Sequence, residues 1–96
     1  MKQPETALIV GAGSGLSASL ARLFAKEGMR VVLAARDTSK LASLVKETSA
    51  FPIACDATDL SQVEAMFAAL EAKWGVPDLV VYNAGYRVRE IGRAHV

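Results

Sequence analysis

The sequence predicts an α/β fold built on a doubly wound parallel sheet, and three observations support this. Short apolar runs alternate with longer stretches of helical spacing, the connections are short, and a glycine cluster follows the first apolar run. The resulting order, βαβαβαβ, is typical of a parallel sheet with right-handed crossovers. We predict the strand order 3-2-1-4, in which the first and fourth strands diverge at a switch point where ligands bind.

The first strand, helix and second strand are predicted from the N-terminal third of the chain. Thr6–Val10 is a short apolar strand, and the helix begins at Leu16. Apolar residues recur along this helix at Leu16, Leu20, Leu23 and Phe24. Gly28 stands where a helix C-cap belongs. Arg30–Ala35 is apolar on both faces, as expected of a buried parallel strand.

A second helix and a third strand follow. Asp37, Thr38 and Ser39 all offer side chains that can cap the helix, whose apolar stripe is Leu41, Leu44 and Val45. The third strand is predicted over Phe51–Cys55. Pro52 is tolerable only at the start of that strand or on a sheet edge, because it has no N–H to donate.

The third helix and fourth strand complete the pattern. Thr58 or Asp59 caps the helix, and Gly75 and Pro77 end it. Its buried side is expected to carry Leu60, Val63, Met66, Phe67, Leu70 and Trp74. Asp78–Tyr82 is predicted as the fourth strand.

Bulk properties limit the chain to one small globular domain of 96 residues, of which 52% are hydrophobic. A net charge of +1 gives no general attraction to nucleic acid or to an acidic membrane. Cys55 is the only cysteine, which excludes an internal disulfide and favours a reducing compartment. With no bilayer-length apolar run and no signal-peptide core, the expected location is the cytoplasm.

The glycine cluster at Gly11, Gly13 and Gly15 is the strongest functional signal. A strand that turns through glycines into a helix aims several backbone N–H groups at one point, where the helix dipole adds positive charge. Side chains here would block a pyrophosphate or the turn itself. The alternative is a tight structural turn, but its position after the first strand favours a dinucleotide and a Rossmann-type sheet.

A second signal, Asn83-Ala84-Gly85, follows the fourth strand directly. In the predicted strand order it lies at the same crevice as the glycine cluster. Asn83 could simply cap the strand end, but at the switch point we favour contact with a cofactor.

These motifs resemble those of the short-chain dehydrogenase/reductase family. Its fingerprint, Thr-Gly-x-x-x-Gly-x-Gly, is matched at Gly11 and Gly15, with Leu16 in the usual apolar position. Its second signature, Asn-Asn-Ala-Gly, appears as Tyr82-Asn83-Ala84-Gly85. The resemblance runs from Thr6 to Gly85 and covers the N-terminal half of the family's domain.

The family also implies an adenine contact after the third strand, at Asp56 and Ala57. Capping of the third helix is the alternative role for Asp56. Three departures, Val10 for Thr, Ser17 for the last Gly and Tyr82 for the first Asn, indicate a divergent member.

Cofactor choice is expected to depend on Arg36, at the end of the second strand. An acidic residue there accepts hydrogen bonds from ribose hydroxyls and selects NAD, whereas an Arg accommodates the 2′-phosphate of NADP. Ser14 could add a hydroxyl to the same phosphate. We predict NADP over NAD. In the alternative, Arg36 is merely solvated, and Asp37 is the ribose ligand or only a helix cap.

The resemblance implies an NADP-dependent oxidoreductase that moves a hydride between nicotinamide and a carbonyl or alcohol substrate, and a homo-oligomeric full-length parent. The family's Ser and Tyr-x-x-x-Lys lie beyond the fourth strand, and neither Tyr82 nor Tyr86 is followed by the Lys. We therefore expect no catalytic residue here and an inactive fragment. One Cys and His95 cannot form a metal site.

Residues 1–86 are interpreted as the N-terminal part of one NAD(P)-binding domain and 87–96 as an irregular tail. We hypothesise that the reading frame is truncated and that residues 91–96 are artefactual. The alternative is a basic tail for an anionic partner. Truncation would leave the fourth strand as an unpaired apolar edge and make the chain marginally stable.

Two other functions remain open. The chain could be a non-catalytic dinucleotide-binding module or a pseudoenzyme. S-adenosylmethionine or FAD is a less favoured ligand, because Asn83-Ala84-Gly85 follows the fourth strand and because such sites usually have an acidic residue at the end of the second strand, where Ala35 and Arg36 stand here.

Overall fold

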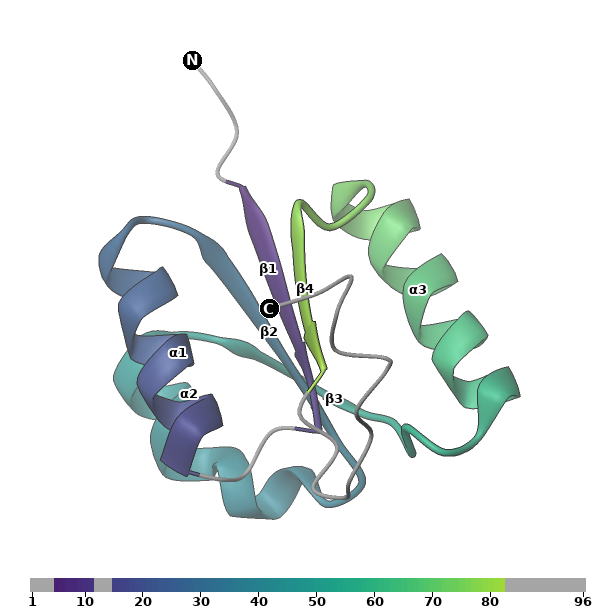
Figure 1. The fold of residues 1–96 in the computed structure, drawn as a ribbon, viewed down its shortest axis with the longest axis horizontal. Helices are drawn as coiled ribbons and strands as arrows, with labels where there is room; N and C mark the ends of the chain where they lie inside the picture. Colours follow the sequence, from purple (N-terminus) through teal and green to yellow (C-terminus); the bar gives the residue numbers. More distant parts are fainter. Residues whose placement is uncertain (1–4, 12–14, 83–96) are drawn as a thin grey trace.

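A computed structural model describes residues 5–11 and 15–82 as a four-stranded parallel sheet with helices on both faces (Figure 1). The elements are β1 (Thr6–Val10), α1 (Gly15–Lys26), β2 (Arg30–Ala35), the 3₁₀ helix η1 (Thr38–Leu41), α2 (Ala42–Thr48), β3 (Phe51–Ala54), α3 (Leu60–Trp74) and β4 (Leu79–Tyr82). The strand order is β3-β2-β1-β4. The predicted fold class and strand order are confirmed.

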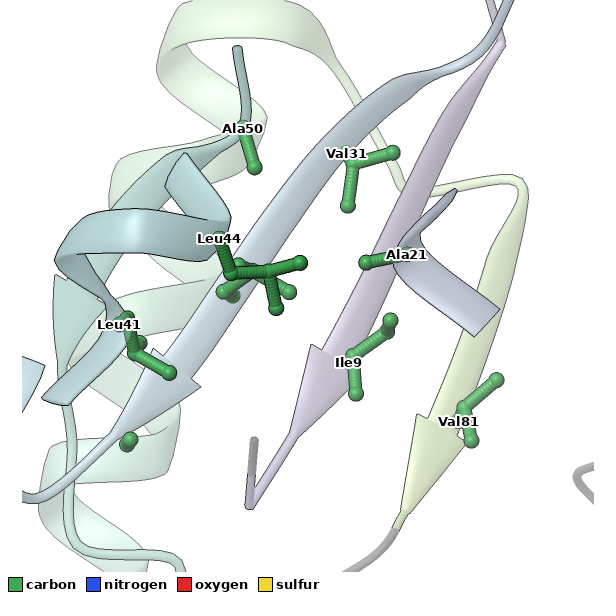
Figure 2. Close-up of a cluster of buried hydrophobic side chains, with 9 residues drawn as sticks. Ile9, Ala21, Val31, Leu41, Leu44, Ala50 and Val81 are labelled. Carbon is green, nitrogen blue, oxygen red and sulfur yellow. The ribbon is translucent and has the colours of Figure 1, made fainter. Parts of the chain in front are cut away.

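Two hydrophobic layers form because side chains alternate across the strands. Ile9 and Leu33 face α1 and α2 and pack with Ala21, Leu41 and Leu44 (Figure 2). On the opposite face, next to α3, lies the second layer: Leu8, Val10, Val32, Ala34, Cys55, Met66 and Leu70. A fully buried Leu or Ile contributes about 1.5–3 kcal/mol, so the two central strands, β1 and β2, supply much of the stability.

The edge strand β3 is protected by its proline. The backbone N–H of Cys55 donates to the carbonyl oxygen of Ala35 at 3.0 Å. Because backbone groups alternate in direction along a strand, the nitrogen of Pro52 faces away from β2. The missing N–H of Pro52 therefore removes no hydrogen bond between β3 and β2. The expected edge position of Pro52 is confirmed.

Two expected apolar stripes are only partly buried. In α1, Leu16 and Leu23 are 62% and 51% exposed, while Ser17 and Ala21 are buried. The small side chains of Ser17 and Ala21 let the helix lie close against the sheet, which turns the larger leucines to the flank. Leu20 and Phe24 are half-buried against the core, as expected.

In α3, Met66 and Leu70 are buried as predicted, and Val63, Phe67 and Trp74 pack half-buried beside them. The expectation for Leu60 was wrong, because this side chain is 70% exposed. Leu60 is the first residue of the helix, directly after its cap, and precedes the stripe that faces the sheet.

Several element boundaries differ from the prediction. The structure ends β3 at Ala54 and begins β4 at Leu79, each one residue inside the expected range. The predicted second helix is divided into η1 and α2. Gly28 and Gly75 follow α1 and α3 with φ of 85° and 89°, so both helices end at glycines as expected.

No helix within residues 5–11 and 15–82 combines the length and apolarity that a bilayer crossing requires.

Candidate functional site

The carboxyl ends of β1 and β4 are neighbours, as the predicted crevice requires. Val10 and Tyr82 are paired at the ends of these parallel strands, and Val10 also pairs with Ala34 of β2. Gly11 follows with φ of 83°, and its N–H donates to the carbonyl oxygen of Ala34 at 2.8 Å. This conformation favours glycine. Gly13, Ser14, Asn83, Ala84 and Gly85 lie outside the described residues.

The first helix begins at this edge of the sheet. Gly15 is exposed and starts α1, and a Cβ placed on it has no heavy atom of the described residues within 4 Å. Packing within the described chain therefore gives no reason for a glycine here. Leu16, the next residue, is exposed. The amino end of α1 places positive partial charge where a ligand phosphate can approach.

After β2, Arg36 is exposed and Asp37 is engaged in a turn. Oδ1 of Asp37 accepts hydrogen bonds from the backbone N–H of Ser39 at 3.0 Å and from its hydroxyl at 2.6 Å. These two bonds hold the pKa of Asp37 below its usual value, and the bond from the hydroxyl contributes most. Asp37 is thus the N-cap of η1, which was one of its two alternative roles.

After β3, Asp56 is fixed by a turn of the same kind. Its Oδ1 accepts from the hydroxyl of Thr58 at 2.7 Å and from the backbone N–H of Thr58 at 2.9 Å. The hydroxyl bond is the main reason that the pKa of Asp56 lies below its usual value, and the charge of Arg36 lowers it further. Neither bond uses the second carboxylate oxygen, Oδ2. Ala57 is half-buried against the α3 layer.

The capping alternative for Asp56 is wrong, because Asp59 is the N-cap of α3. Oδ1 of Asp59 accepts from the N–H groups of Ser61 and Gln62 at 3.0 and 3.3 Å. The hydrogen bond from the hydroxyl of Ser61 is the main reason that the pKa of Asp59 lies below its usual value. The prediction of Thr58 or Asp59 as the cap is confirmed for Asp59.

Two residues that sequence reasoning missed hold the loop after β3. Thr58 binds the carboxylate of Asp56, and Oε1 of Gln62 accepts from the backbone N–H of Asp56 at 2.9 Å. An Asp followed two positions later by Thr or Ser is a known turn pattern. The spacing Asp56-x-Thr58 could have revealed the first contact, but the Gln62 contact requires the fold.

Arg36 and Asp56 come together because their strands are paired. Ala35 and Ala54 are opposite each other in β2 and β3, so the residues that follow leave the sheet at the same edge. Gly11, Gly15, Arg36 and Asp56 thus gather around the carboxyl ends of three neighbouring strands. An exposed arginine at this edge of the sheet suits an anionic ligand.

Cys55 is buried at 3% exposure, and desolvation raises the pKa of its thiol. It packs as a core residue rather than as a nucleophile. Among the described residues, no three His, Cys, Asp or Glu side chains are grouped to hold a metal ion.

Comparison with known proteins gives a consistent result. The family model for short chain dehydrogenase matches residues 5–95. An NADPH-dependent pterin aldehyde reductase from Arabidopsis thaliana is 39% identical over 84 residues, which cover 83% of this chain and 35% of that protein.

Two solved structures are similar in both sequence and fold. An actinorhodin polyketide ketoreductase variant with NADPH is 36% identical, with a TM-score of 0.78 over 86% of this chain and 34% of that one. A metagenomic short-chain oxidoreductase in complex with NADP is 34% identical, with a TM-score of 0.81 over 85% and 39%. The chain spans about a third of the length of the first curated relatives, 31% and 33%.

Proposed function

Because this chain belongs to the short chain dehydrogenase family, we propose that it forms the cofactor-binding part of an NADP-preferring oxidoreductase. The bound cofactor supplies the hydride chemistry, between its nicotinamide and a carbonyl or alcohol carbon of a small substrate. The residues of this chain bind and orient the cofactor, and none of them is assigned a catalytic role.

The pyrophosphate would be held by the turn between β1 and α1. Gly11 has a positive φ that favours glycine, a Cβ on Gly15 would enter open space, and the amino end of α1 adds favourable charge. Gly13 and Ser14 complete this turn in the proposal, with Leu16 beginning the helix behind it. Asn83, Ala84 and Gly85 would close the crevice from β4.

The adenine would lie beside the loop after β3. Asp56 is held there in its ionised form by Thr58, with Oδ2 left to accept a hydrogen bond from an amino group. Ala57 next to it offers backbone and an apolar surface. The role follows the family's pattern, and the turn geometry supports it.

The preference for NADP rests on one observation above all: Arg36, the first residue after β2, is exposed at the carboxyl edge of the sheet. A guanidinium at this position favours a 2′-phosphate. The NADPH and NADP in the two similar solved structures support the same choice.

Calorimetric titration of the chain with NADP and with NAD tests this proposal. We expect NADP to bind at least tenfold more tightly, because its 2′-phosphate gains a charge-assisted contact with Arg36. Arg36→Ala should remove this difference while Lys46→Ala, which removes an exposed charge on α2, should keep it. Tighter binding of NAD by the unaltered chain would refute the NADP preference, and binding of neither nucleotide would refute the proposed function.

We also propose a cytoplasmic location for the protein. The single cysteine is a buried free thiol, which suits a reducing compartment.

A further inference from the structure

Asp56, which the proposed function places beside the adenine, has nearly all its polar atoms in hydrogen bonds. Its Oδ1 is held by Thr58, and its carbonyl oxygen accepts from the backbone N–H of Asp59 at 3.0 Å. The N–H of Asp56 donates to Oε1 of Gln62 at 2.9 Å. Within the described part of the chain, Oδ2 of Asp56 accepts no hydrogen bond. One acceptor atom on a fixed backbone therefore remains for a ligand.

Gln62 is the contact that ties this loop to the body of a helix. Thr58 and Asp59 precede α3 in the loop itself, whereas Gln62 belongs to the first turn of α3. Met66 lies four residues further on, on the same face of the helix, and is only 3% exposed. Because Met66 is buried against the sheet, this face of α3 is anchored, and Gln62 extends the anchor to the backbone of Asp56.

The side-chain amide of Gln62 is oriented at both ends. Its Nε2 donates to Oδ2 of Asp59 at 3.2 Å, while its Oε1 accepts from the N–H of Asp56. Since only the nitrogen can donate and only the oxygen can accept, these two partners define one orientation of the amide. Asp59 is itself the N-cap of α3. A chain of hydrogen bonds thus runs from the helix cap through Gln62 to Asp56.

A groove beside the loop gives this hydrogen bond a role that packing does not perform. The groove has a volume of about 220 Å³ and lies between β3 and α3, lined by Ile53, Ala54, Gln62, Ala65, Met66 and Ala69. Three of these side chains are alanines, which are too small to fix the separation of strand and helix by contact. The hydrogen bond from Asp56 to Gln62 fixes that separation at the carboxyl end of β3.

We propose that Gln62 is a positioning residue for the adenine of the cofactor, which it aligns by holding Asp56 so that Oδ2 faces the exocyclic amino group. The inference rests on the proposed function and extends it from one contact to the residue that directs this contact. Base selectivity follows from it. Hypoxanthine carries a carbonyl oxygen in place of the amino group, and two acceptors that face each other repel.

The preference for NADP over nicotinamide hypoxanthine dinucleotide phosphate measures this positioning, because the two ligands differ only at one edge of the base. In calorimetric titrations, the unaltered chain should bind NADP about tenfold more tightly. Gln62→Met removes both polar atoms at similar side-chain length. It should reduce the preference about threefold, by weakening NADP alone, as expected for one exposed hydrogen bond. Partial unfolding would weaken both ligands equally, so the ratio still reports the positioning.

Ser61→Ala is the matched control. The hydroxyl of Ser61 donates to Oδ1 of Asp59 at 2.8 Å, so it supports the same helix cap without contacting Asp56. A merely structural role of Gln62 would lower the unfolding free energy in both variants and leave the base preference intact. An unchanged preference in Gln62→Met would overturn the inference, as would an equal reduction of the preference in Ser61→Ala.

The remaining outcomes separate this inference from the proposed function. If Asp56→Ala removes the base preference while Gln62→Met retains it, the proposed function stands and this inference fails. If the unaltered chain binds both ligands equally, the adenine contact of Asp56 and this inference fail together, while the dinucleotide site stands. If the unaltered chain binds neither ligand, the proposed function fails as well.

Discussion

Aspartate side chains at the two ends of the parallel sheet bind partners at different distances along the chain. At the amino end, hydrogen bonds join segments far apart in sequence: Thr6 N–H donates to Oδ2 of Asp78 at 2.8 Å, 72 residues away. The N–H of Asp78 returns a bond to the carbonyl of Thr6 at 2.9 Å. At the carboxyl end, the carboxylates of Asp37, Asp56 and Asp59 bind partners only two or three residues away.

Aromatic and cationic side chains add to the amino end. The ring of Trp74 meets that of Phe51 edge-on at 5.2 Å between centroids, and the guanidinium of Arg30 lies 4.7 Å from the Trp74 ring centroid. These contacts connect α3, β3 and β2. The side chain of Arg30 also donates to the hydroxyl of Thr6 in β1, at 3.4 Å.

The difference indicates that the amino end contributes mainly to stability and the carboxyl end mainly to ligand binding. Long-range contacts at the amino end fix the strands against one another, so changes there should alter stability. The aspartate turns at the carboxyl end shape each loop separately, which leaves the space between the loops for a ligand that connects them. Variants at the two ends should therefore separate stability from binding.

The largest effect on stability is expected from Trp74→Ala. The variant loses the contacts with Phe51 and Arg30 and part of the packing under α3. Its unfolding free energy should therefore fall by about 2–3 kcal/mol. This is less than for a fully buried tryptophan, because Trp74 is only partly buried. Urea unfolding followed by circular dichroism measures it, since Trp74 is the only tryptophan available for fluorescence.

Leu60→Ala on the same helix is the matched control. With a side chain 70% exposed, it should change the unfolding free energy by less than about 0.5 kcal/mol. Should Trp74→Ala leave the chain unfolded, the milder Trp74→Phe still tests the cluster. An unfolding free energy for Trp74→Phe equal to that of the unaltered chain would show that the amino end is not held by this ring.

A smaller loss is expected from Asp78→Ala. The N–H of Thr6 is part of a residue only 2% exposed, and removal of its acceptor leaves a buried donor unsatisfied, at a cost of about 1 kcal/mol. Asp78→Asn keeps an acceptor oxygen and should recover most of this stability in the same urea experiment. Equal losses in both variants would mean that the negative charge, rather than the hydrogen bond, is what matters.

Much of the fold follows from the sequence because local patterns and topology agree. Alternating apolar strands, the glycines at helix ends and the edge position of Pro52 all come from the spacing and type of single residues. Right-handed crossovers then fix the strand order. The sequence also indicated the neighbouring ends of β1 and β4, since that adjacency follows from topology.

The predictions that failed concern positions where tertiary packing, rather than the local sequence pattern, decides which side chains are buried. Leucines at helical spacing in α1 predicted a buried stripe, but the close approach of Ser17 and Ala21 to the sheet turned Leu16 and Leu23 outward. The amino-end cluster of Arg30, Phe51 and Trp74 was not foreseen, because its members come from three distant segments. The role of Gln62 beneath Asp56 likewise depends on how α3 docks.

The smallest expected effect is a loss of stability in acid that arises from the carboxyl end. Hydrogen bonds to Ser39, Thr58 and Ser61 hold the pKa values of Asp37, Asp56 and Asp59 below their usual value of 3.8. A carboxyl whose pKa is depressed by folding stabilises the folded chain above the unfolded pKa and loses that contribution as pH falls through the folded pKa. Stability should therefore be constant from pH 7 to about 5 and decline below about 4.

In the triple variant Asp37→Asn, Asp56→Asn and Asp59→Asn this decline should be shallower, whereas in Asp78→Asn the aspartate turns remain and most of the decline should persist. If the triple variant declined as steeply as the unaltered chain, the acid sensitivity would have to come from elsewhere in the molecule, and the aspartate turns would shape the loops without contributing to stability.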